Sequence, residues 1–318
     1  MSNFDHILLI GFGGPESPEQ IMPFLRLVTA GRNIPDARLQ MVAHHYEAIG
    51  GKSPYNAWAA QLQKDIAALI GEELPVFLGY RNTAPFLKEV LLDIHDRGFK
   101  KGVGVILAPF RSTAGCRRYK ENIHEALHQN GIMDLSYSYL PPWYNHPDLI
   151  KLIADLVKNE IKKIPSELRQ HTEIMFSCHS IPLMMEKDCA SCIYSAEYEA
   201  AARLVADGVG LFEWKHVYQS RSGSTTQLWL EPDILETIKA SAAAGKKAVL
   251  VIPMGFLSDN AEVLYDLDIE AKKLAEDLGL SFYRVSTPQN SAVLVELFED
   301  LIRQALKNPR NKNSCTVS

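Results

Sequence analysis

The chain alternates short apolar runs with longer segments in which apolar positions recur with a helical period. Short apolar runs that end at turn residues are typical of buried strands, and the longer periodic segments are typical of helices. The runs predict strands at 6–12, 74–80, 102–109, 172–180, 216–220, 246–253 and 280–286. The periodic segments predict helices at 17–29, 56–71, 85–98, 117–131, 147–163, 194–210, 233–245, 260–279 and 291–307.

Strands and helices alternate along the whole chain, and the strands are continuously apolar. This combination indicates parallel sheets covered by helices on both faces. Three prolines in 140–149 interrupt the alternation. The sequence therefore predicts an α/β fold of two similar doubly wound units of Rossmann or flavodoxin-like type. Each unit has a parallel four-stranded sheet, and a ligand cleft lies between the units. We place the units at 1–142 and 143–310, followed by a frayed tail at 311–318.

Composition narrows the class of protein. The chain has 318 residues, a net charge of −5 and an isoelectric point near 6.1, and it contains no basic block. These values argue against a nucleic-acid partner. No apolar run approaches the roughly 18 residues of a membrane span. The amino-terminal segment also lacks the basic and small-residue features of a signal peptide. We therefore expect a cytoplasmic enzyme.

Two segments that leave predicted strands carry the candidate chemistry. FSCHSIP (176–182) sets His179 after an apolar run, and Glu262 follows the apolar run AVLVIP at the start of a predicted helix. Ligands of open α/β sheets bind where strands end. An imidazole and a carboxylate at two such exits suit either a metal ion or the transfer of a proton. Asp266 and Glu270 follow at helical spacing, so the three acids share one helix face and suggest a path for cations.

Each feature also has an ordinary structural explanation. Acidic stripes are usually solvated helix faces, and acids in a first turn favour the helix dipole. A single histidine is often a hydrogen-bonded structural residue. The functional interpretation depends on the joint placement of His179 and the acids at strand exits.

Five motifs, in order, resemble those of the ferrochelatase family, whose members insert ferrous iron into a porphyrin during haem synthesis. They are GFGGPESPEQIMPFL, HYEAIGGKSPYN (45–56), FSCHSIP, QSRSGSTTQLWLEPDI (219–234) and PMGFLSDNAEVLYDLDIE. The resemblance runs through nearly the whole length. It implies a lyase that inserts Fe²⁺ into protoporphyrin IX or coproporphyrin III and needs no cofactor for the chemistry.

The resemblance also implies roles for individual residues. His179 and Glu262 take the places of the family's central histidine and glutamate, where iron enters and pyrrole protons leave. With Asp266 and Glu270 they form the implied metal or proton path. A neutral imidazole can accept a proton, and carboxylates can strip water from a cation.

A second group of residues is implied in holding the macrocycle. Tyr46, Ser53 and Tyr119 align with residues that contact the ring or its propionates, and Arg32 joins them. Phe12 stands where some bacterial members have tyrosine and others methionine. Phenylalanine cannot ligate iron, so the resemblance implies no axial tyrosinate here. Which porphyrin binds depends on how propionates pair with basic side chains, and the candidates are Arg32, His45, Arg111, Arg117 and Arg118.

Two positions depart from the family pattern. Asn260 stands where the family usually has histidine. An amide forms hydrogen bonds but does not titrate, so a proton step assigned to that histidine is absent or moved in this chain. Cys178 replaces the alanine that precedes the central histidine, which is a small change in volume.

The cysteines carry a separate hypothesis. Some ferrochelatases hold a [2Fe-2S] cluster, and Cys116, Cys178, Cys189 and Cys192 provide the four thiolates that a cluster needs. Cys315 is alone in the tail. Structural zinc and unligated thiols are the alternatives. Strand alternation turns Cys178 away from the others, which makes it the weakest candidate.

Two rival functions stay open. One is a related chelatase that inserts cobalt or iron into sirohydrochlorin, and the other is a non-catalytic porphyrin or haem carrier on the same fold. A carrier has no need of the acids at 262, 266 and 270. We expect porphyrin and ferrous iron as ligands, and transient contact with a membrane or with another haem-pathway enzyme. The sequence does not indicate an oligomeric state.

Overall fold

The computed structural model describes residues 4–31, 34–187, 193–221 and 227–307, and contains two compact units. Unit 1 comprises the residues up to Pro109, Gly115–Trp143 and the segment from Asn290. Unit 2 comprises Phe110–Ala114 and Tyr144–Gln289. In the described part of the chain, no helix is both long and apolar enough to cross a membrane.

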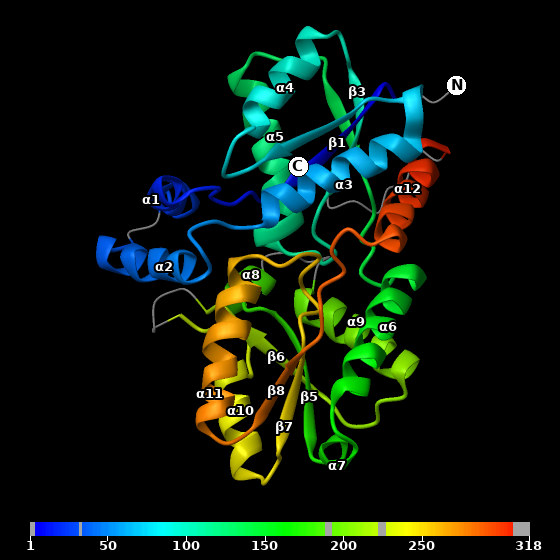
Figure 1. The fold of residues 1–318 in the computed structure, drawn as a ribbon. Coiled ribbons are helices and arrows are strands. Elements are labelled where there is room, and N and C mark those ends of the chain that lie inside the picture. The colour runs from blue at the N-terminus through cyan, green and yellow to red at the C-terminus, as the bar shows by residue number, and fades with distance from the viewer. Residues whose placement is uncertain (1–3, 32–33, 188–192, 222–226, 308–318) are drawn as a thin grey trace. The chain divides into compact units, whose positions relative to one another are not determined.

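Each unit is built on a four-stranded sheet in which all neighbouring strands are parallel (Figure 1). The first sheet has the order β2-β1-β3-β4, with β1 at His6–Gly11, β2 at Val76–Tyr80, β3 at Lys101–Ile106 and β4 at Ser136–Tyr139. The second has the order β6-β5-β7-β8, with β5 at Thr172–His179, β6 at Lys215–Gln219, β7 at Ala248–Ile252 and β8 at Ser281–Arg284. The predicted α/β fold with two parallel four-stranded sheets is confirmed.

Helices cover both faces of each sheet, as the apolar strands require. Unit 1 has α1 (Pro18–Val28), α2 (Asp36–Ala48), α3 (Tyr55–Ile70), α4 (Leu87–Asp96), α5 (Arg118–Gln129) and α12 (Ala292–Lys307). Unit 2 has α6 (Pro147–Lys163), α7 (Ser166–Arg169), α8 (Leu183–Lys187), α9 (Tyr194–Val209), α10 (Ile234–Ala243) and α11 (Lys272–Asp277). A 3₁₀ turn at Gly71–Glu73 and two π-helical segments, Thr113–Arg117 and Glu262–Ala271, complete the elements.

The core of each unit lies between its sheet and these helices. On one face of the first sheet, Leu8 and Ile10 of β1 pack with Leu91 of α4 and Ile123 of α5. On one face of the second, Val249 and Val251 of β7 pack with Ile238 of α10 and Leu267 of the π-helical segment. Figure 1 shows α10 and α11 on one side of the second sheet and α6 with α9 on the other. The rigid sheets thereby fix where each strand ends.

The short helices α7 and α8, the strand β4 and the helix α2 had no predicted range. The last two lack a local signal for different reasons. Strand β4 has the sequence SYSY, in which serines alternate with tyrosines, so it forms no apolar run. Helix α2 buries Leu39, Ala43 and Tyr46, but the apolar residues around them do not form a single stripe. Both elements depend on packing against neighbouring elements more than on local sequence.

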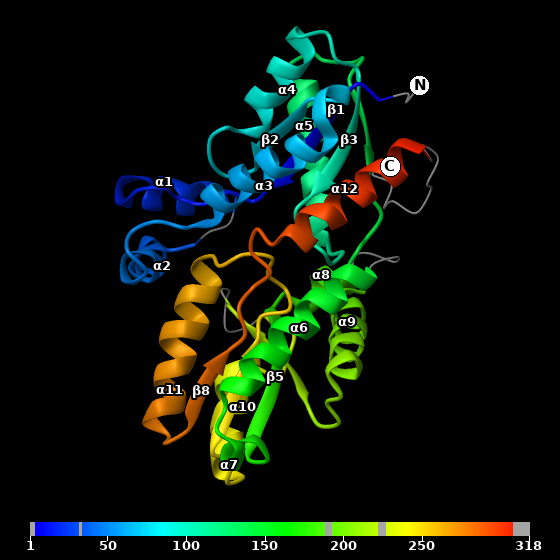
Figure 2. The same ribbon diagram turned by 45° about the vertical axis from the view of Figure 1, so that its right-hand side comes forward.

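Helix α12 follows β8 in the chain but packs in unit 1 against α3 and β3, as Figure 2 shows. The ring of Phe298 lies 5.1 Å from that of Trp143, and Arg303 donates a hydrogen bond to the carbonyl of Leu69 at 3.1 Å. From its place in the chain, the sequence predicts this helix as part of the carboxy-terminal unit, 143–310.

Candidate active site

The carboxyl edge of the second sheet brings together the exits of β5, β6 and β7. Strand β5 lies between the other two, and its last residue, His179, is in register with Gln219 at the end of β6. Chain segments that leave parallel strands gather at one edge of a sheet. The structure therefore places His179 and the segment leading to Glu262 at the same edge of unit 2.

The imidazole of His179 has a defined orientation. Its Nδ1 lies 2.5 Å from the carbonyl oxygen of Ser180. A carbonyl only accepts, so Nδ1 carries a hydrogen. The side chain is partly exposed. The contact with Ser180 thus orients the ring so that Nε2 is the nitrogen at which a neutral imidazole would accept a proton.

A buried tyrosine supports the backbone at His179. Tyr194, in α9, donates its hydroxyl to the carbonyl of His179 at 3.0 Å. The same hydroxyl lies 2.6 Å from the thiol of Cys178. Burial raises the pKa of the Cys178 thiol to about 12, so the thiol is protonated near neutrality. These contacts fix the end of β5.

The predicted acidic row lies on a π-helical segment, where an α-helix was expected. Glu262, Asp266 and Glu270 all belong to Glu262–Ala271, which continues as α11. A π-helix bonds residue i to i+5 instead of i+4, which widens each turn. Residues four apart still lie near one line along such a segment. The row therefore persists, and Asp266 is electrostatically coupled to both of the other acids.

Asp266 has the strongest change in acidity within this row. Burial raises the pKa of its carboxyl from 3.8 to about 7, with repulsion from Glu262 and Glu270 adding to the rise. A hydrogen bond from the hydroxyl of Ser220 opposes that change. Partial burial and Asp233 also raise the pKa of Glu270. The middle of the row therefore titrates near neutral pH.

The acids form a row and not an enclosed metal cage. Within the described ranges, no three histidine, cysteine, aspartate or glutamate side chains converge as ligands of one ion. A cation passing along the row would keep part of its water shell, as is usual for sites with few protein ligands.

Asn260 begins the helical segment that carries the row. Its side-chain oxygen accepts a hydrogen bond from the backbone N–H of Val263 at 3.0 Å, and its carbonyl accepts from Leu264 at 2.9 Å. This is the arrangement of a helix cap, a role that asparagine performs well. The structure thus gives the amide at this departure from the family pattern a structural role.

The residues expected to hold a macrocycle lie in unit 1, near the exit of β1. Phe12 follows β1 directly and contacts the ring of Phe24 edge-on at 6.2 Å. Phe24 in turn contacts Tyr46 at 6.0 Å. Tyr46 is buried and Phe12 is partly buried. The structure brings these two predicted residues into one aromatic row through Phe24, which the sequence did not single out.

Ser53 and Tyr119 are both buried. The backbone N–H of Ser53 donates to the carbonyl of Pro15 at 2.8 Å, which ties its loop to the turn after β1. A Cβ on Gly14 would lie 2.7 Å from that of Ser53, so the turn needs glycine there. Tyr119 packs in the core between β1, α4 and α5. Arg32 lies outside the described residues.

Three of the basic candidates for propionate pairing, Arg111, Arg117 and Arg118, already have acidic partners. Burial, Arg38 and His44 lower the pKa of a fourth, His45. The backbone N–H and Nε of Arg111 both bond to the buried carboxylate of Glu197. Arg117 and Arg118 pair with Glu121 at 2.9 and 3.2 Å.

The cysteines proposed as cluster ligands are described only in part. Cys116 is partly buried against the core of unit 1, while Cys178 is fully buried in unit 2. Cys189 and Cys192 lie outside the described residues.

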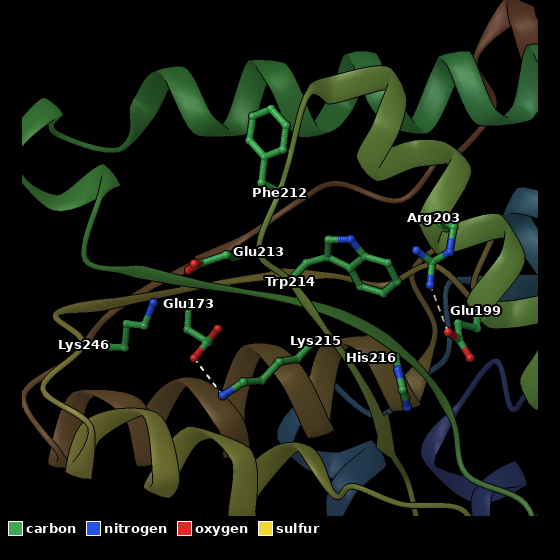
Figure 3. Close-up of a pocket in the computed structure, with 9 residues that line it drawn as sticks. All are labelled: Glu173, Glu199, Arg203, Phe212, Glu213, Trp214, Lys215, His216 and Lys246. Carbon is green, nitrogen blue, oxygen red and sulfur yellow. Dashed lines mark hydrogen bonds and ion pairs between the residues drawn. The ribbon is translucent and has the colours of Figure 1, made fainter.

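A cavity of about 570 Å³ lies at the opposite edge of the second sheet (Figure 3). Glu173 and Lys215, at the amino ends of β5 and β6, line it and form an ion pair of 2.8 Å. Arg203 lies over the ring of Trp214 with 5.8 Å to its centroid. Because its walls are ion-paired and it lies away from the strand exits, we do not assign the active site to it.

The sequence did not assign a role to Gln219 or Ser220, although both stand in a recognised motif. Gln219 is 1% exposed and donates a hydrogen bond to the carbonyl of Glu262 at 2.9 Å. Ser220 bonds to Asp266. One signal in the sequence could have pointed to them, because Gln219 and Ser220 are two polar residues directly after the apolar strand residues Val217 and Tyr218.

Two solved structures of chelatases have the same fold as this chain. The sirohydrochlorin chelatase SirB from Bacillus subtilis subspecies spizizenii, in complex with cobalt, has a TM-score of 0.60 at 12% identity and covers 97% of this chain and 98% of its own. CbiX, described as the terminal enzyme of sirohaem biosynthesis in denitrifying bacteria, has a TM-score of 0.52 at 12% identity, covering 94% and 99%. This likeness shows the fold of the chelatases.

Sequence comparison defines the family. The ferrochelatase family model matches residues 5–306. A coproporphyrin III ferrochelatase of Mycolicibacterium smegmatis is 38% identical over 96% of this chain and 90% of its own length. One from Mycobacterium leprae is 35% identical over 94% and 88%. The chain belongs to the ferrochelatase family, and it is a lyase that inserts ferrous iron into a porphyrin.

Proposed function

We propose that the porphyrin substrate is coproporphyrin III and that His179 and Glu262 carry out proton removal and metal delivery. The substrate proposal is supported by similar relatives named coproporphyrin III ferrochelatase, which are matched over about nine-tenths of their length. The single observation that supports the catalytic roles is that His179 and the acidic row leave one edge of the second sheet.

His179 acts as the acceptor of pyrrole protons. A free-base porphyrin must lose two pyrrole protons as a metal dication enters, so that charge and mass balance. Nδ1 of His179 is committed to Ser180, which leaves Nε2 as the basic atom. A neutral imidazole suits this step near pH 7.

The acidic row delivers the cation and carries protons away. The carboxyl groups of Glu262 and Glu270 attract a hydrated dication, and a carboxylate can replace part of its water shell. Asp266 lies between them with a pKa of about 7, so it can bind and release a proton under working conditions. Because Asp266 can be either protonated or ionised, the same row can carry cations towards the porphyrin and protons away from it.

Unit 1 supplies the residues that hold the macrocycle. Phe12 and Tyr46 offer aromatic surface, and Arg32 pairs a propionate. Ser53 holds its loop beside the turn after β1, and Tyr119 packs in the core next to β1. Binding energy from such a surface can favour a distorted ring whose nitrogen lone pairs are exposed to the metal. Phe12 cannot ligate iron, so the proposal includes no axial protein ligand from this position.

An anaerobic metalation assay tests the proposal. Purified protein receives ferrous iron with coproporphyrin III, protoporphyrin IX or sirohydrochlorin in separate reactions. We expect the free-base bands to collapse fastest with coproporphyrin III. Preference for protoporphyrin IX would overturn the substrate assignment, and preference for sirohydrochlorin would favour the sirohydrochlorin chelatase. Binding without metalation in all reactions would favour a carrier.

The [2Fe-2S] cluster stays a hypothesis, with Cys178 as its weakest ligand. A ligand must be a thiolate, whereas the Cys178 thiol is buried, bonded to Tyr194 and has a pKa of about 12. Visible absorption in freshly purified protein that is lost in Cys116→Ser would support a cluster. Colourless protein free of iron would reject it. A cytoplasmic location and contact with a membrane or another haem-pathway enzyme also stay predictions.

A further inference from the structure

Gln219 is a polar side chain in a fully buried position at the end of β6. An unpaired buried amide destabilises the folded state, because the hydrogen bonds that it makes to water when unfolded are not replaced. Such a group is therefore retained only where its hydrogen bonds are satisfied or where it has a function. The contacts of Gln219 indicate which elements it joins.

The side-chain amide of Gln219 bridges two elements of the catalytic edge. Its Oε1 accepts a hydrogen bond from the hydroxyl of Ser177 in β5 at 2.6 Å. Its Nε2 donates to the carbonyl of Glu262 at 2.9 Å. One planar amide thus links the strand that ends in His179 to the first residue of the π-helical segment.

The backbone of Gln219 adds a third connection. It is in register with His179, and its carbonyl accepts a hydrogen bond from the N–H of Ser180 at 2.8 Å. The carbonyl of Ser180 is the group that orients the imidazole. Gln219 therefore contacts the supports of both residues to which we assign the chemistry.

We propose that Gln219 is a positioning residue that sets the position of Glu262 relative to His179. The inference rests on the proposed function of these two residues. Because catalytic groups misplaced by about 1 Å can lose about 100-fold in rate, a rigid tie between them has a direct effect on turnover. Gln219 does not contact porphyrin or metal in this role.

Ser220, the next residue, makes a further contact with the helical segment that carries the acidic row. Its backbone φ is +62°, a left-handed conformation that non-glycine residues adopt rarely. In this conformation its hydroxyl reaches the carboxylate of Asp266, four residues beyond Glu262. The adjacent residues Gln219 and Ser220 thereby contact Glu262 and Asp266, which lie on successive turns of the helical segment.

Removal of the amide tests the tie. Gln219→Met keeps a similar volume but loses both side-chain hydrogen bonds. We expect kcat for metalation to fall about 10- to 100-fold, with the Kd for porphyrin unchanged. Ser177→Ala is the milder variant, which removes one anchor of the amide and should lower kcat severalfold. The double variant should be no slower than Gln219→Met alone, because the two side chains act through one contact.

Ser241→Ala provides the matched control. Ser241 is also fully buried in unit 2, and its hydroxyl bonds to Glu173 and to the Thr237 carbonyl. We expect it to lower the melting temperature without changing kcat. If Gln219→Met and Ser177→Ala lost no more turnover than Ser241→Ala at equal folded fraction, the positioning role would be overturned. If wild-type protein did not metalate any porphyrin, the proposed function itself would fail and this inference with it.

Discussion

The two units have the same strand order but place different chemistry at corresponding strand ends. Strands β1 and β5 hold the second position in their sheets, and β3 and β7 hold the third. After β1 comes Phe12, whereas β5 ends with His179. The scaffold therefore determines where side chains are presented, and the exit residues determine what they do.

The segments after the third strands extend this comparison. Both lead into a helix through a π-helical stretch, Thr113–Arg117 before α5 and Glu262–Ala271 before α11. The first ends with Arg117, which is paired with Glu121, while the second carries the acidic row. The two stretches therefore differ in charge, and it is the acidic one to which we assign the transfer of cations and protons.

Amide side chains hold strand exits in both units. In unit 1, Asn82 follows β2 and donates through Nδ2 to the carbonyl of Phe12 at 3.1 Å. In unit 2, Gln219 at the end of β6 donates to the carbonyl of Glu262. In each unit, an amide at the exit of the edge strand therefore holds the backbone of a neighbouring segment, by contacts that differ in detail.

The largest expected effect lies in unit 2. His179→Ala should lower kcat about 100- to 10,000-fold by removing the proton acceptor, while porphyrin still binds. Stopped-flow metalation and porphyrin fluorescence quenching measure the two quantities. His171→Ala, before the start of the same strand and exposed, is the control. Equal turnover in the two variants would end the assignment of His179.

The acidic row should show the next largest effect. Glu262→Gln should lower kcat about 100-fold, because one charge at the metal entry is lost while the hydrogen-bonding shape is kept. Glu276→Gln changes an exposed acid further along the same helical run and should leave turnover unchanged. Rates are compared over a range of iron concentrations. A normal kcat for Glu262→Gln would end the assignment of Glu262 to metal delivery.

Substitution of the aromatic row in unit 1 should instead weaken binding. Phe12→Leu should raise the Kd for porphyrin about 10-fold and leave kcat within about threefold, since an aromatic contact is worth about 1 kcal/mol. Phe99→Leu, another partly buried aromatic of the same core, is the control. If kcat fell while the Kd for porphyrin stayed unchanged, the assignment of binding to unit 1 and of catalysis to unit 2 would be wrong.

The pKa of Asp266 predicts how turnover depends on pH. At limiting iron, turnover should fall as the pH drops through about 7, because protonation removes a charge from the row. Asp266→Asn should be slower throughout and should lack this decline. A pH–rate profile from pH 5.5 to 8.5 measures both. An unchanged acidic limb in Asp266→Asn would assign the titration to another group.

The same carboxyl has a smaller effect on stability. Its folded pKa lies above 3.8, so the folded state holds the proton more tightly, and this stabilisation is lost as the pH rises through about 7. Asp266→Asn should therefore gain stability relative to wild type at pH 8, by on the order of 1 kcal/mol. Urea unfolding at pH 5 and pH 8 measures the difference, and an equal change at both values would contradict it.

Much of the fold followed from periodicity because continuous apolar runs end at turn residues. The exits at His179 and Glu262 could be placed in this way, since a strand end is a local feature. Strand β4 could not, because its SYSY sequence is stable only beside β3. The π-helical geometry of the row could not be predicted either, because its residues favour an ordinary α-helix locally.

The supports of the site also escaped prediction. Gln219 and Glu262 are 43 residues apart, and no local rule pairs an amide with a distant carbonyl. Tyr194 reaches His179 from α9 by the same kind of long-range contact. Sequence motifs supplied the residues to which we assign the chemistry, whereas the residues that hold them in place became visible only from packing.

The placement of α12 has a consequence for synthesis on the ribosome. Unit 1 begins before unit 2 in the chain but is completed by α12 (Ala292–Lys307), which follows all of unit 2. Amino-terminal domains usually fold first as the chain emerges. Here all of unit 2 has been made before the buried face of α12, including Phe298 and Ile302, can pack in unit 1. The first unit to be translated is therefore the last to be completed, and a chain stalled near its end would leave unit 1 open while unit 2 is whole.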